Sequence, residues 1–323
     1  MNRVLVTGGA GTIGGAVVRR LVSDPAWEVR VSDQREAPAW MRESCEVHTG
    51  NLLVLDEARR AAQGCTHVIH LAAIVGGSAN FHRLPHTLLE VNNGLYNAVF
   101  RAALEQRVER LVYVSSSMVF ERATEFPTTE EHLAECAAPH SAYGFSKLAG
   151  EKYCLALHDE HGLPYTICRP FNAYGPGEEP DDEPGIAHMV PDVIRKVLSG
   201  ARPLPIFGSG EQTRTFTHID DIAAGIAAAM AHPAAENEDF NVSASEERTV
   251  AEIARVIWEA CGEDPDAFEL EHRPSFEVDV QRRWPSVEKA RRLLGWEAQI
   301  GLPEGIAATV EWLREHELAA RGG

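Results

Sequence analysis

Tyr143 and Lys147 form the first pair in the sequence whose residue types and spacing suggest chemistry. They are four residues apart in the segment Tyr-Gly-Phe-Ser-Lys. In a helix, residues at this spacing lie on one face with their Cβ atoms about 5–6 Å apart. An ammonium beside a phenol stabilises the phenolate and lowers the tyrosine pKa from its reference value of about 10. The pair therefore predicts a tyrosine that acts as a base near neutral pH.

A run of three serines, Ser115, Ser116 and Ser117, directly follows the apolar segment 111–114. Open α/β sheets bind ligands outside the carboxyl ends of their strands. A hydroxyl at this point is therefore placed to hold a substrate oxygen and to share its proton. No Gly-x-Ser-x-Gly elbow surrounds the run, which disfavours a nucleophilic hydrolase serine.

A glycine-rich turn lies near the start of the chain. Gly8, Gly11 and Gly14 follow an apolar segment at 3–7 and precede a helical pattern at 16–22. Such a turn lets backbone N–H groups approach a pyrophosphate, and the N-terminus of the following helix adds its positive dipole end. The spacing departs by one residue from Gly-x-Gly-x-x-Gly, but the strand before it and the helix after it favour dinucleotide binding.

Asp33 ends a second predicted strand at 28–32. It stands about 20 residues after the glycine turn, as the dinucleotide fingerprint requires. A carboxylate at this position accepts hydrogen bonds from the adenosine ribose hydroxyls and repels a 2′-phosphate. The sequence therefore predicts NAD rather than NADP as the cofactor, although the cation of Arg35 is close in sequence.

These residues need a parallel sheet to bring them together, and the rest of the chain predicts one. Apolar segments alternate with helical patterns, which favours parallel strands with helices on both faces. Right-handed crossovers make such a sheet doubly wound. We therefore predict an α/β fold: a Rossmann-type doubly wound parallel sheet with a smaller C-terminal substrate-binding domain. The further predicted strands are 67–72, 111–114 and 164–168.

The character of the chain changes after Arg169. Residues 172–190 are rich in proline, glycine and acidic residues and predict a loop that acts as a lid. We predict a first domain at 1–171, to which 215–245 return, and a smaller domain at 172–323. Helices are predicted at 219–230, with Asp220 and Asp221 as its N-cap, at 249–261 and at 286–294.

The composition disfavours several classes of protein. The chain has 323 residues and a net charge of −18, which argues against nucleic acid or an anionic membrane as a partner. Its six cysteines include no Cys-x-x-Cys pair, and His158 and His161 lack a carboxylate partner, so we expect no metal. No apolar run approaches the roughly 20 residues that span a bilayer. A first strand that begins at Arg3 leaves no room for a signal peptide, and we expect a cytoplasmic protein.

Together these motifs resemble the extended short-chain dehydrogenase/reductase family, in its nucleotide-sugar epimerase and dehydratase branch. The resemblance covers nearly the whole chain. It is carried by Thr7 to Gly14, Asp33, Leu71-Ala-Ala73, the serine run, Tyr143-x-x-x-Lys147, Arg169-Pro-Phe-Asn-Ala-Tyr-Gly-Pro176 and Arg214-Thr-Phe-Thr-His-Ile-Asp-Asp221.

The resemblance implies a role for each matching residue. Tyr143 is the catalytic base, Lys147 binds the nicotinamide ribose and tunes Tyr143, and Ser117 holds the reacting sugar hydroxyl. The residues implied in NAD binding are Gly8, Gly11, Thr12, Ile13, Gly14, Asp33, Gln34, Asn51, Leu52, Leu71, Ala72, Ala73, Asn92, Ser115, Tyr143, Lys147 and Pro170. Those implied in binding the nucleotide sugar are Ser116, Ser117, Met118, Tyr143, Asn172, Val190, Arg214, which faces the diphosphate, and Arg273.

Three segments depart from the family pattern. Asn51-Leu52 follows Gly50 where the family often has an aspartate, which leaves the adenine contact open. The Asn-x-x-Gly-Thr motif becomes Asn92-Asn-Gly-Leu-Tyr96. The Arg-Pro-Gly-Asp motif becomes Arg273-Pro-Ser-Phe276, which leaves the contacts to the nucleotide base open.

The residues after the serine run favour one branch of the family. Relatives that eliminate water resemble Thr-Asp-Glu here and relatives that decarboxylate glucuronate keep a glutamate, whereas Ser117-Met118-Val119 has no carboxylate. The chain therefore resembles the C4 epimerases, which need one base and a tightly held NAD. The implied reaction inverts C4 of a nucleotide-activated hexose, by family default a UDP-sugar, through a 4-keto sugar. A dehydratase, a decarboxylase, a 4-keto reductase and a non-catalytic sensor remain open alternatives.

Two predicted helices, 91–104 and 143–157, carry apolar residues on more than one side. Val99, Phe100 and Leu104 stand on the first, and Leu148, Tyr153 and Leu155 on the second. Relatives pair these helices into a dimer interface. The resemblance therefore implies a homodimer.

Overall fold

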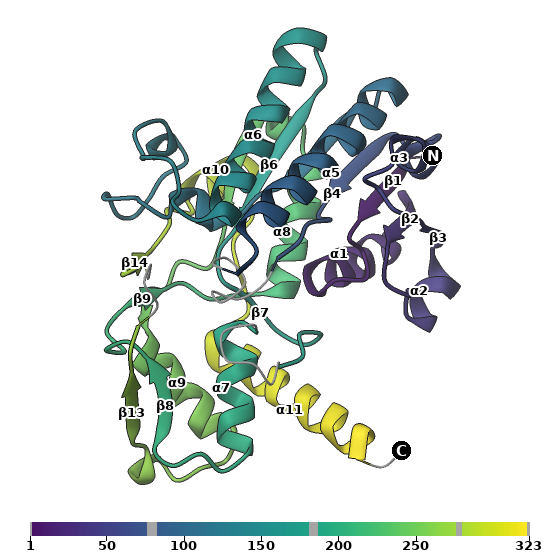
Figure 1. Cartoon of the computed structure of the whole chain (residues 1–323). Coiled ribbons are helices and arrows are strands. Elements are labelled where there is room, and N and C mark those ends of the chain that lie inside the picture. Colours follow the sequence, from purple (N-terminus) through teal and green to yellow (C-terminus); the bar gives the residue numbers. More distant parts are fainter. Residues whose placement is uncertain (1, 76–82, 181–186, 276–279, 322–323) are drawn as a thin grey trace.

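The computed structural model describes residues 2–75, 83–180, 187–275 and 280–321. Figure 1 shows a large parallel sheet with helices on both faces and, below it, a smaller group of helices and short strands. The predicted α/β fold is confirmed. The division into domains at 171 and 172 stays a prediction.

The central sheet has seven parallel strands in the order β3-β2-β1-β4-β5-β6-β11. The order reverses between β1 and β4, and in open α/β sheets ligands bind outside the carboxyl ends of the strands at such a point. The strands are β1 (Asn2–Thr7), β2 (Trp27–Asp33), β3 (Glu46–Thr49), β4 (His67–His70), β5 (Arg110–Val114), β6 (Tyr165–Pro170) and β11 (Glu238–Val242).

Alternation along β1 shows how the sheet is buried on both faces. Val4 and Val6 belong to a core on one face, and Leu5 belongs to a core on the other. This period of two is what a pleated strand imposes. The first face is covered by α1 (Thr12–Val22), α2 (Ala39–Ser44), α8 (Ile219–Ala231) and α10 (Glu288–Leu294). The second is covered by α3 (Leu55–Ala62), α5 (Pro85–Gln106) and α6 (Ala142–His161).

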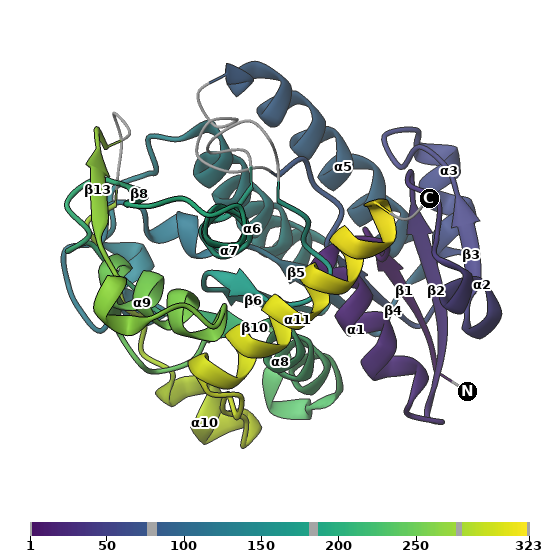
Figure 2. The same ribbon diagram turned by 90° about the horizontal axis from the view of Figure 1, so that it is seen from below.

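The smaller part has its own core around Trp258, which is completely buried. In Figure 2 the long α11 runs diagonally across this part, where it packs against α9 and α7. Its elements are α7 (Met189–Leu198), β8 (Leu204–Phe207), α9 (Val250–Ala260), β13 (Leu270–Arg273) and α11 (Leu302–Arg321). Two-residue strands link the parts: β7 (Ala173–Tyr174), β9 (Thr213–Arg214), β10 (Thr217–His218), β12 (Arg248–Thr249) and β14 (Arg282–Arg283).

Several predicted boundaries shift in the structure. The first helix begins at Thr12 rather than 16, because Gly11 is its N-cap. The N-cap of α8 is His218, whose ring accepts a hydrogen bond from the N–H of Asp220. Asp220 and Asp221 lie instead in the first turn, where acidic side chains favour the helix dipole.

Other expectations fall on or beside undescribed residues. Residues 181–186, in the segment predicted to be a lid, lie outside the described ranges, and so does Phe276.

Two helices of the C-terminal half begin close to their predicted starts. The predicted helix 286–294 begins at Glu288, and the helix predicted from 249 begins at Val250 with Thr249 as its N-cap. Strand β3 had no counterpart among the predicted strands. None of the helices in the described ranges is long and apolar enough to cross a membrane.

Candidate active site

A cleft of about 1240 Å³ runs along the carboxyl ends of the strands. One wall comes from the residues that follow β1, β2, β4, β5 and β6, and the facing wall comes from α7, β8 and β14. The cleft therefore lies at the edge of the sheet that parallel topology assigns to ligands.

The glycine turn at one end of the cleft is too tight for larger residues. A Cβ on Gly8, whose φ is +71°, would lie 2.8 Å from the backbone N of Ala72. A Cβ on Gly14 would lie 2.1 Å from the carbonyl oxygen of Gly8. The N-cap of α1, Gly11, makes no side-chain capping bond, and the first turn of α1 has no acidic residue. Backbone N–H groups and the positive end of the helix dipole are thus left for an anionic ligand.

Asp33 closes this end of the cleft from the tip of β2. Its Oδ2 accepts a hydrogen bond from the N–H of Ala10 at 3.0 Å, and its Oδ1 accepts one from the N–H of Arg35 at 3.0 Å. The Arg35 guanidinium lies 3.5 Å from the same carboxylate. The glycine turn and this carboxylate fit the pyrophosphate and ribose of a dinucleotide, which is the pairing the sequence predicted.

Tyr143 and Lys147 lie one turn apart on α6, and both line the cleft. Lys147 Nζ donates to the carbonyl of Val114 at 2.9 Å and lies 5.9 Å from the centre of the Tyr143 ring. Close packing requires a glycine directly after Tyr143, because a Cβ on Gly144 would lie 2.7 Å from the carbonyl oxygen of Met118. This close approach brings the start of α6 against the serine run.

Burial dominates the ionisation of this pair. Burial raises the pKa of Tyr143, against a hydrogen bond with the Ser116 side chain and the charge of Arg283, which both lower it. Burial also lowers the pKa of Lys147 to about 8, against the carboxylate of Glu151, which raises it. The sequence predicted a tyrosine pKa lowered by the lysine. The structure instead shows a raised pKa, because burial removes the Tyr143 phenol from water.

The serine that faces the tyrosine is Ser116 rather than Ser117. Ser116 is the N-cap of the short turn 117–120, where its Oγ accepts the N–H of Met118 at 3.1 Å, and its side chain is hydrogen-bonded to Tyr143. Ser117 is the first residue of the turn and is 3% exposed. Ser116 is thus the hydroxyl in contact with Tyr143, because the direction of the turn decides which of three successive side chains faces α6. Ser117 also lines the cleft, and the role assigned to it from the sequence stays a prediction.

Asn172, which follows β6, contacts Arg283 of β14 on the facing wall. Asn172, at a positive φ of 36°, donates through Nδ2 to the carbonyl of Thr215 at 2.7 Å. Its Oδ1 accepts from Arg283 Nη1 at 3.2 Å, and Arg283 Nη2 lies 2.9 Å from the Met118 sulfur. The Arg283 guanidinium is thus held beside Met118, the residue that directly follows Ser116 and Ser117.

Most residues predicted from the sequence line this one cleft. The predicted NAD-binding residues that line it are Gly8, Gly11, Thr12, Ile13, Gly14, Asp33, Gln34, Leu52, Leu71, Ala72, Ala73, Ser115, Tyr143, Lys147 and Pro170. The predicted substrate residues that line it are Ser116, Ser117, Met118, Tyr143, Asn172 and Arg214.

Four predicted residues do not line the cleft. Asn92 is completely buried and ties the Ile74 backbone to α5 through hydrogen bonds of 2.8 and 3.3 Å. Asn51 is exposed and accepts from Gln34. Val190 lies in the core of the smaller part, and Arg273 is half-exposed beside Glu271. Their roles in binding stay predictions, and for Val190 and Arg273 the structure gives no direct support.

Sequence analysis missed two side chains that shape the site. Arg283 stands in Gln-Arg-Arg-Trp, which matches no motif, and only the fold brings it to the serines. Glu151 had a signal that was available: it follows Lys147 by the same four residues that separate Lys147 from Tyr143. Three polar residues at this spacing lie on one helix face.

Comparisons with known proteins agree with this geometry. The family described as the NAD dependent epimerase/dehydratase family matches residues 4–243. The UDP-glucose 4-epimerase of Mycolicibacterium smegmatis is 31% identical over 97% of this chain and 98% of its own. UDP-glucuronic acid decarboxylase 1 of Xenopus tropicalis is 29% identical over 97% of this chain and 72% of its own. The structure of Thermus thermophilus UDP-glucose 4-epimerase complexed with NAD superposes with a TM-score of 0.83, at 29% identity, over 97% of this chain and 99% of its own.

Proposed function

The chain belongs to the NAD-dependent epimerase/dehydratase family, and from that premise we propose that it inverts C4 of a nucleotide-activated hexose, with UDP as the nucleotide. The observation that carries the proposal is the surroundings of Tyr143. Its phenol is hydrogen-bonded to Ser116, and the segment 116–118 that faces it contains no carboxylate. One base and one hydroxyl are what reversible proton removal from a sugar alcohol needs.

NAD is the cofactor, and the glycine turn, Asp33 and Lys147 are the groups that would hold it. The tight turn at Gly8 and Gly14 leaves backbone N–H groups for the pyrophosphate. The Asp33 carboxylate, held by the Ala10 N–H, would accept hydrogen bonds from the ribose hydroxyls. When bound, NAD supplies an acceptor and donor of hydride for the sugar carbon. The chain's own task is then to move the proton on the adjacent oxygen.

Tyr143 is the group that takes this proton. Burial alone keeps this phenol neutral, but the Lys147 ammonium and the positive nicotinamide ring of bound NAD would favour its phenolate. In that form Tyr143 accepts the proton of the sugar O4 and later returns it, while Ser116 orients the same oxygen. The proposed sequence passes through a 4-keto sugar, which must turn between proton removal and proton return. The volume of about 1240 Å³ is enough for a ligand larger than one hexose and is consistent with such a turn.

The lack of an acid beside Ser116 argues against elimination. A leaving hydroxyl needs a proton donor, and the positions after Ser116 hold a hydroxyl and a thioether, Ser117 and Met118. Glu121 lines the cleft, but its Oε2 accepts from both the N–H and the Oγ of Ser141 at 3.0 and 2.9 Å. This carboxylate is engaged in holding Ser141, the N-cap of α6.

One observation favours a second candidate, decarboxylation of a uronic acid. The Arg283 guanidinium beside Met118 is suited to hold a carboxylate in a bidentate manner. A UDP-glucuronic acid decarboxylase is also among the similar proteins. The two reactions share Tyr143 and differ in whether carbon dioxide is released.

A panel of sugar nucleotides tests the proposal. The purified protein is incubated with UDP-glucose, UDP-N-acetylglucosamine, UDP-glucuronate, dTDP-glucose and GDP-mannose, and the products are separated by chromatography and identified by NMR. The expected result is a pair of C4 epimers that reach the same ratio from either side, with no carbon dioxide and no lasting absorbance at 340 nm. A pentose, a 6-deoxy-4-keto sugar or a stoichiometric rise in NADH would contradict it.

We further propose a homodimer through α5 and α6. Val99 and Phe100 on α5 belong to the core of the chain itself and give no support for an interface. Leu104, Tyr153 and Leu155 are only partly buried and remain available to a second copy. Light scattering at micromolar concentration should give twice the chain mass, and a monomer mass would contradict the proposal.

A further inference from the structure

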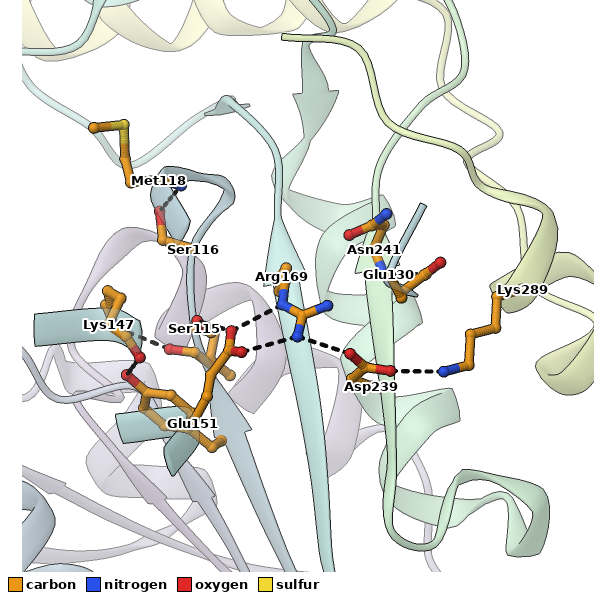
Figure 3. A network of polar contacts seen from close by, with 12 residues as sticks. Ser115, Ser116, Met118, Glu130, Lys147, Glu151, Arg169, Asp239, Asn241 and Lys289 are labelled. Atoms are coloured by element: carbon orange, nitrogen blue, oxygen red, sulfur yellow. Dashed lines mark hydrogen bonds and ion pairs between the residues drawn. The ribbon is translucent and has the colours of Figure 1, made fainter. Parts of the chain in front are cut away.

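Behind the catalytic pair, α6 carries a third polar residue, Glu151, which is 2% exposed. Its Oε1 accepts hydrogen bonds from Ser115 Oγ at 2.6 Å and from Arg169 Nε at 2.8 Å, and its Oε2 accepts from Arg169 Nη2 at 2.8 Å (Figure 3). Buried carboxylates are held only when they are paired and hydrogen-bonded, and this one is engaged on both oxygens.

Ser115 stands between the two residues that the catalytic pair contacts. The carbonyl of Val114 accepts the hydrogen bond from Lys147 at 2.9 Å, and Ser116 bonds Tyr143. The backbone N–H of Ser115 is also held by the neighbouring strand β6, at 2.8 Å. By holding the Ser115 side chain, the Glu151 carboxylate therefore also holds the end of β5 in place. Lys147 and Tyr143 make their contacts with the residues on either side of Ser115.

The far side of the network keeps Arg169 paired independently of Glu151. Arg169 Nη2 lies 2.7 Å from Asp239 Oδ2, and Lys289 Nζ lies 2.6 Å from Asp239 Oδ1. Figure 3 shows the chain of contacts from Ser115 through Glu151 and Arg169 to Lys289. Loss of the Glu151 charge would thus leave the Arg169 guanidinium with an anionic partner.

We propose that Glu151 is a positioning residue for the reaction: through its hydrogen bond with Ser115 it holds the end of β5, with which Lys147 and Tyr143 both make contact. The alternative is a buried ion pair that serves stability alone. The inference rests on the proposed function only in naming Lys147 as a working residue.

Among the groups around Lys147, Glu151 is the one whose charge favours the ammonium form of the lysine. Tyr143 and Tyr113 present their rings at 5.9 and 5.4 Å, and burial raises the pKa of both phenols, which leaves them neutral. Burial lowers the pKa of His70 to about 3, with the Lys147 charge acting in the same direction, so this ring is neutral as well. Glu151 is the carboxylate that raises the pKa of Lys147 against burial.

The first test needs neither substrate nor turnover. The chain has only four lysines (Lys147, Lys152, Lys196 and Lys289), so NMR of a ¹³C-lysine-labelled protein resolves each ammonium, and Lys147→Arg assigns the signal of interest. Lys147 should titrate near pH 8. In Glu151→Gln it should titrate at a lower pH. In the matched control Lys289→Met, which breaks the far end of the same network, it should titrate as in the unmodified protein.

The outcomes decide between the two explanations. An unchanged Lys147 titration in Glu151→Gln, or an equal shift in Lys289→Met, overturns the proposal. Because the titration is independent of any sugar nucleotide, it stands or falls separately from the C4 epimerase activity.

The second test isolates the hydrogen bond from the charge. Ser115→Ala keeps Glu151 paired with Arg169 and removes only the Ser115 contact. We expect kcat to fall by about 10- to 100-fold, the range that a displaced catalytic group produces, with KM and the melting temperature little changed. This variant also keeps the inference testable if Glu151→Gln does not fold. A kcat equal to that of the unmodified protein overturns the positioning through Ser115.

Discussion

The two walls of the cleft are built in different ways. On the sheet side, Tyr143 and Lys147 are buried on one helix, and the polar groups around them bond to β5 or to Glu151. On the facing side, Arg214 and Arg283 stand on two-residue strands, and their neighbours come from segments far apart in the chain. The catalytic pair of the first wall is thus held by a long helix, whereas the two arginines of the second wall stand on short strands.

This difference suggests that the sheet wall carries out the reaction and that the facing wall selects the substrate. Reacting groups must be held within a fraction of an ångström, which packed helices and strands provide. Groups that recognise a substituent vary more freely on connecting segments supported by a rigid scaffold. We therefore expect substitutions in the sheet wall to reduce turnover, and substitutions in the facing wall to change which sugar nucleotide is accepted.

Tyr143→Phe should produce the largest effect on the sheet wall. The substitution removes one oxygen and keeps the ring and its packing, so folding and NAD binding should survive. Loss of a general base costs about 10²–10⁴-fold in rate, and we expect a loss of this size in kcat. Tyr153→Phe, on the same helix but partly buried in the core between helices, is the matched control and should keep full activity. Equal rates for Tyr143→Phe and the unmodified protein would remove the proposed base.

Ser116→Ala should come next and distinguishes two neighbouring hydroxyls. A hydrogen bond to a charged group contributes about 1.5–3 kcal/mol, which corresponds to roughly 10- to 100-fold in kcat/KM. Ser117→Ala should change the rate less, because its hydroxyl is not the one bonded to Tyr143. Steady-state kinetics of both variants make the comparison. A larger loss in Ser117→Ala would favour the assignment made from the sequence alone.

The sheet wall is also the part that could be predicted from the sequence. The glycine turn, Asp33 and the Tyr143–Lys147 pair are short local patterns, and local patterns fix strand, turn and helix faces. Arg283 could not be found this way, since only tertiary packing brings β14 to Met118. The contact between Ser116 and Tyr143 could not be found for a related reason: directly after a strand, a shift of one residue decides which side chain faces the next helix. The role assigned to Ser117 stays a prediction.

Asp33→Ala should have a smaller effect, confined to cofactor choice. Alanine could no longer accept hydrogen bonds from the ribose hydroxyls or repel a 2′-phosphate. The ratio of the affinities for NAD and NADP should therefore fall by about tenfold. Asp33→Asn separates the two contributions, because it keeps an acceptor for the Ala10 N–H and removes only the charge. The affinities for NAD and NADP are measured by isothermal titration calorimetry. Equal affinities in the unmodified protein would show that Asp33 is not the discriminator.

The last variant prediction concerns stability rather than activity, and it is a dependence of the free energy of unfolding on pH. The pKa of Lys147 is lowered from its ordinary 10.5 to about 8 in the folded chain. Between these values the unfolded chain binds more protons, so the contribution of this group to stability rises as pH increases from about 8 toward 10.5. Lys147→Met should remove this rise in denaturant unfolding. Lys289→Met should keep it, because the pKa of Lys289 is raised in the folded chain and both states stay protonated in this window.

The central claim is that one base, Tyr143, serves a reversible inversion at C4 in which nothing is lost from the sugar. It is tested most directly with the preferred sugar nucleotide carrying deuterium at C4, incubated in ordinary water and analysed by NMR and mass spectrometry. The account predicts that the C4 epimer forms with its deuterium still at C4 and that Tyr143→Phe forms it at least about 10²-fold more slowly. A product that has lost this deuterium, a carboxyl group or a hydroxyl would contradict it.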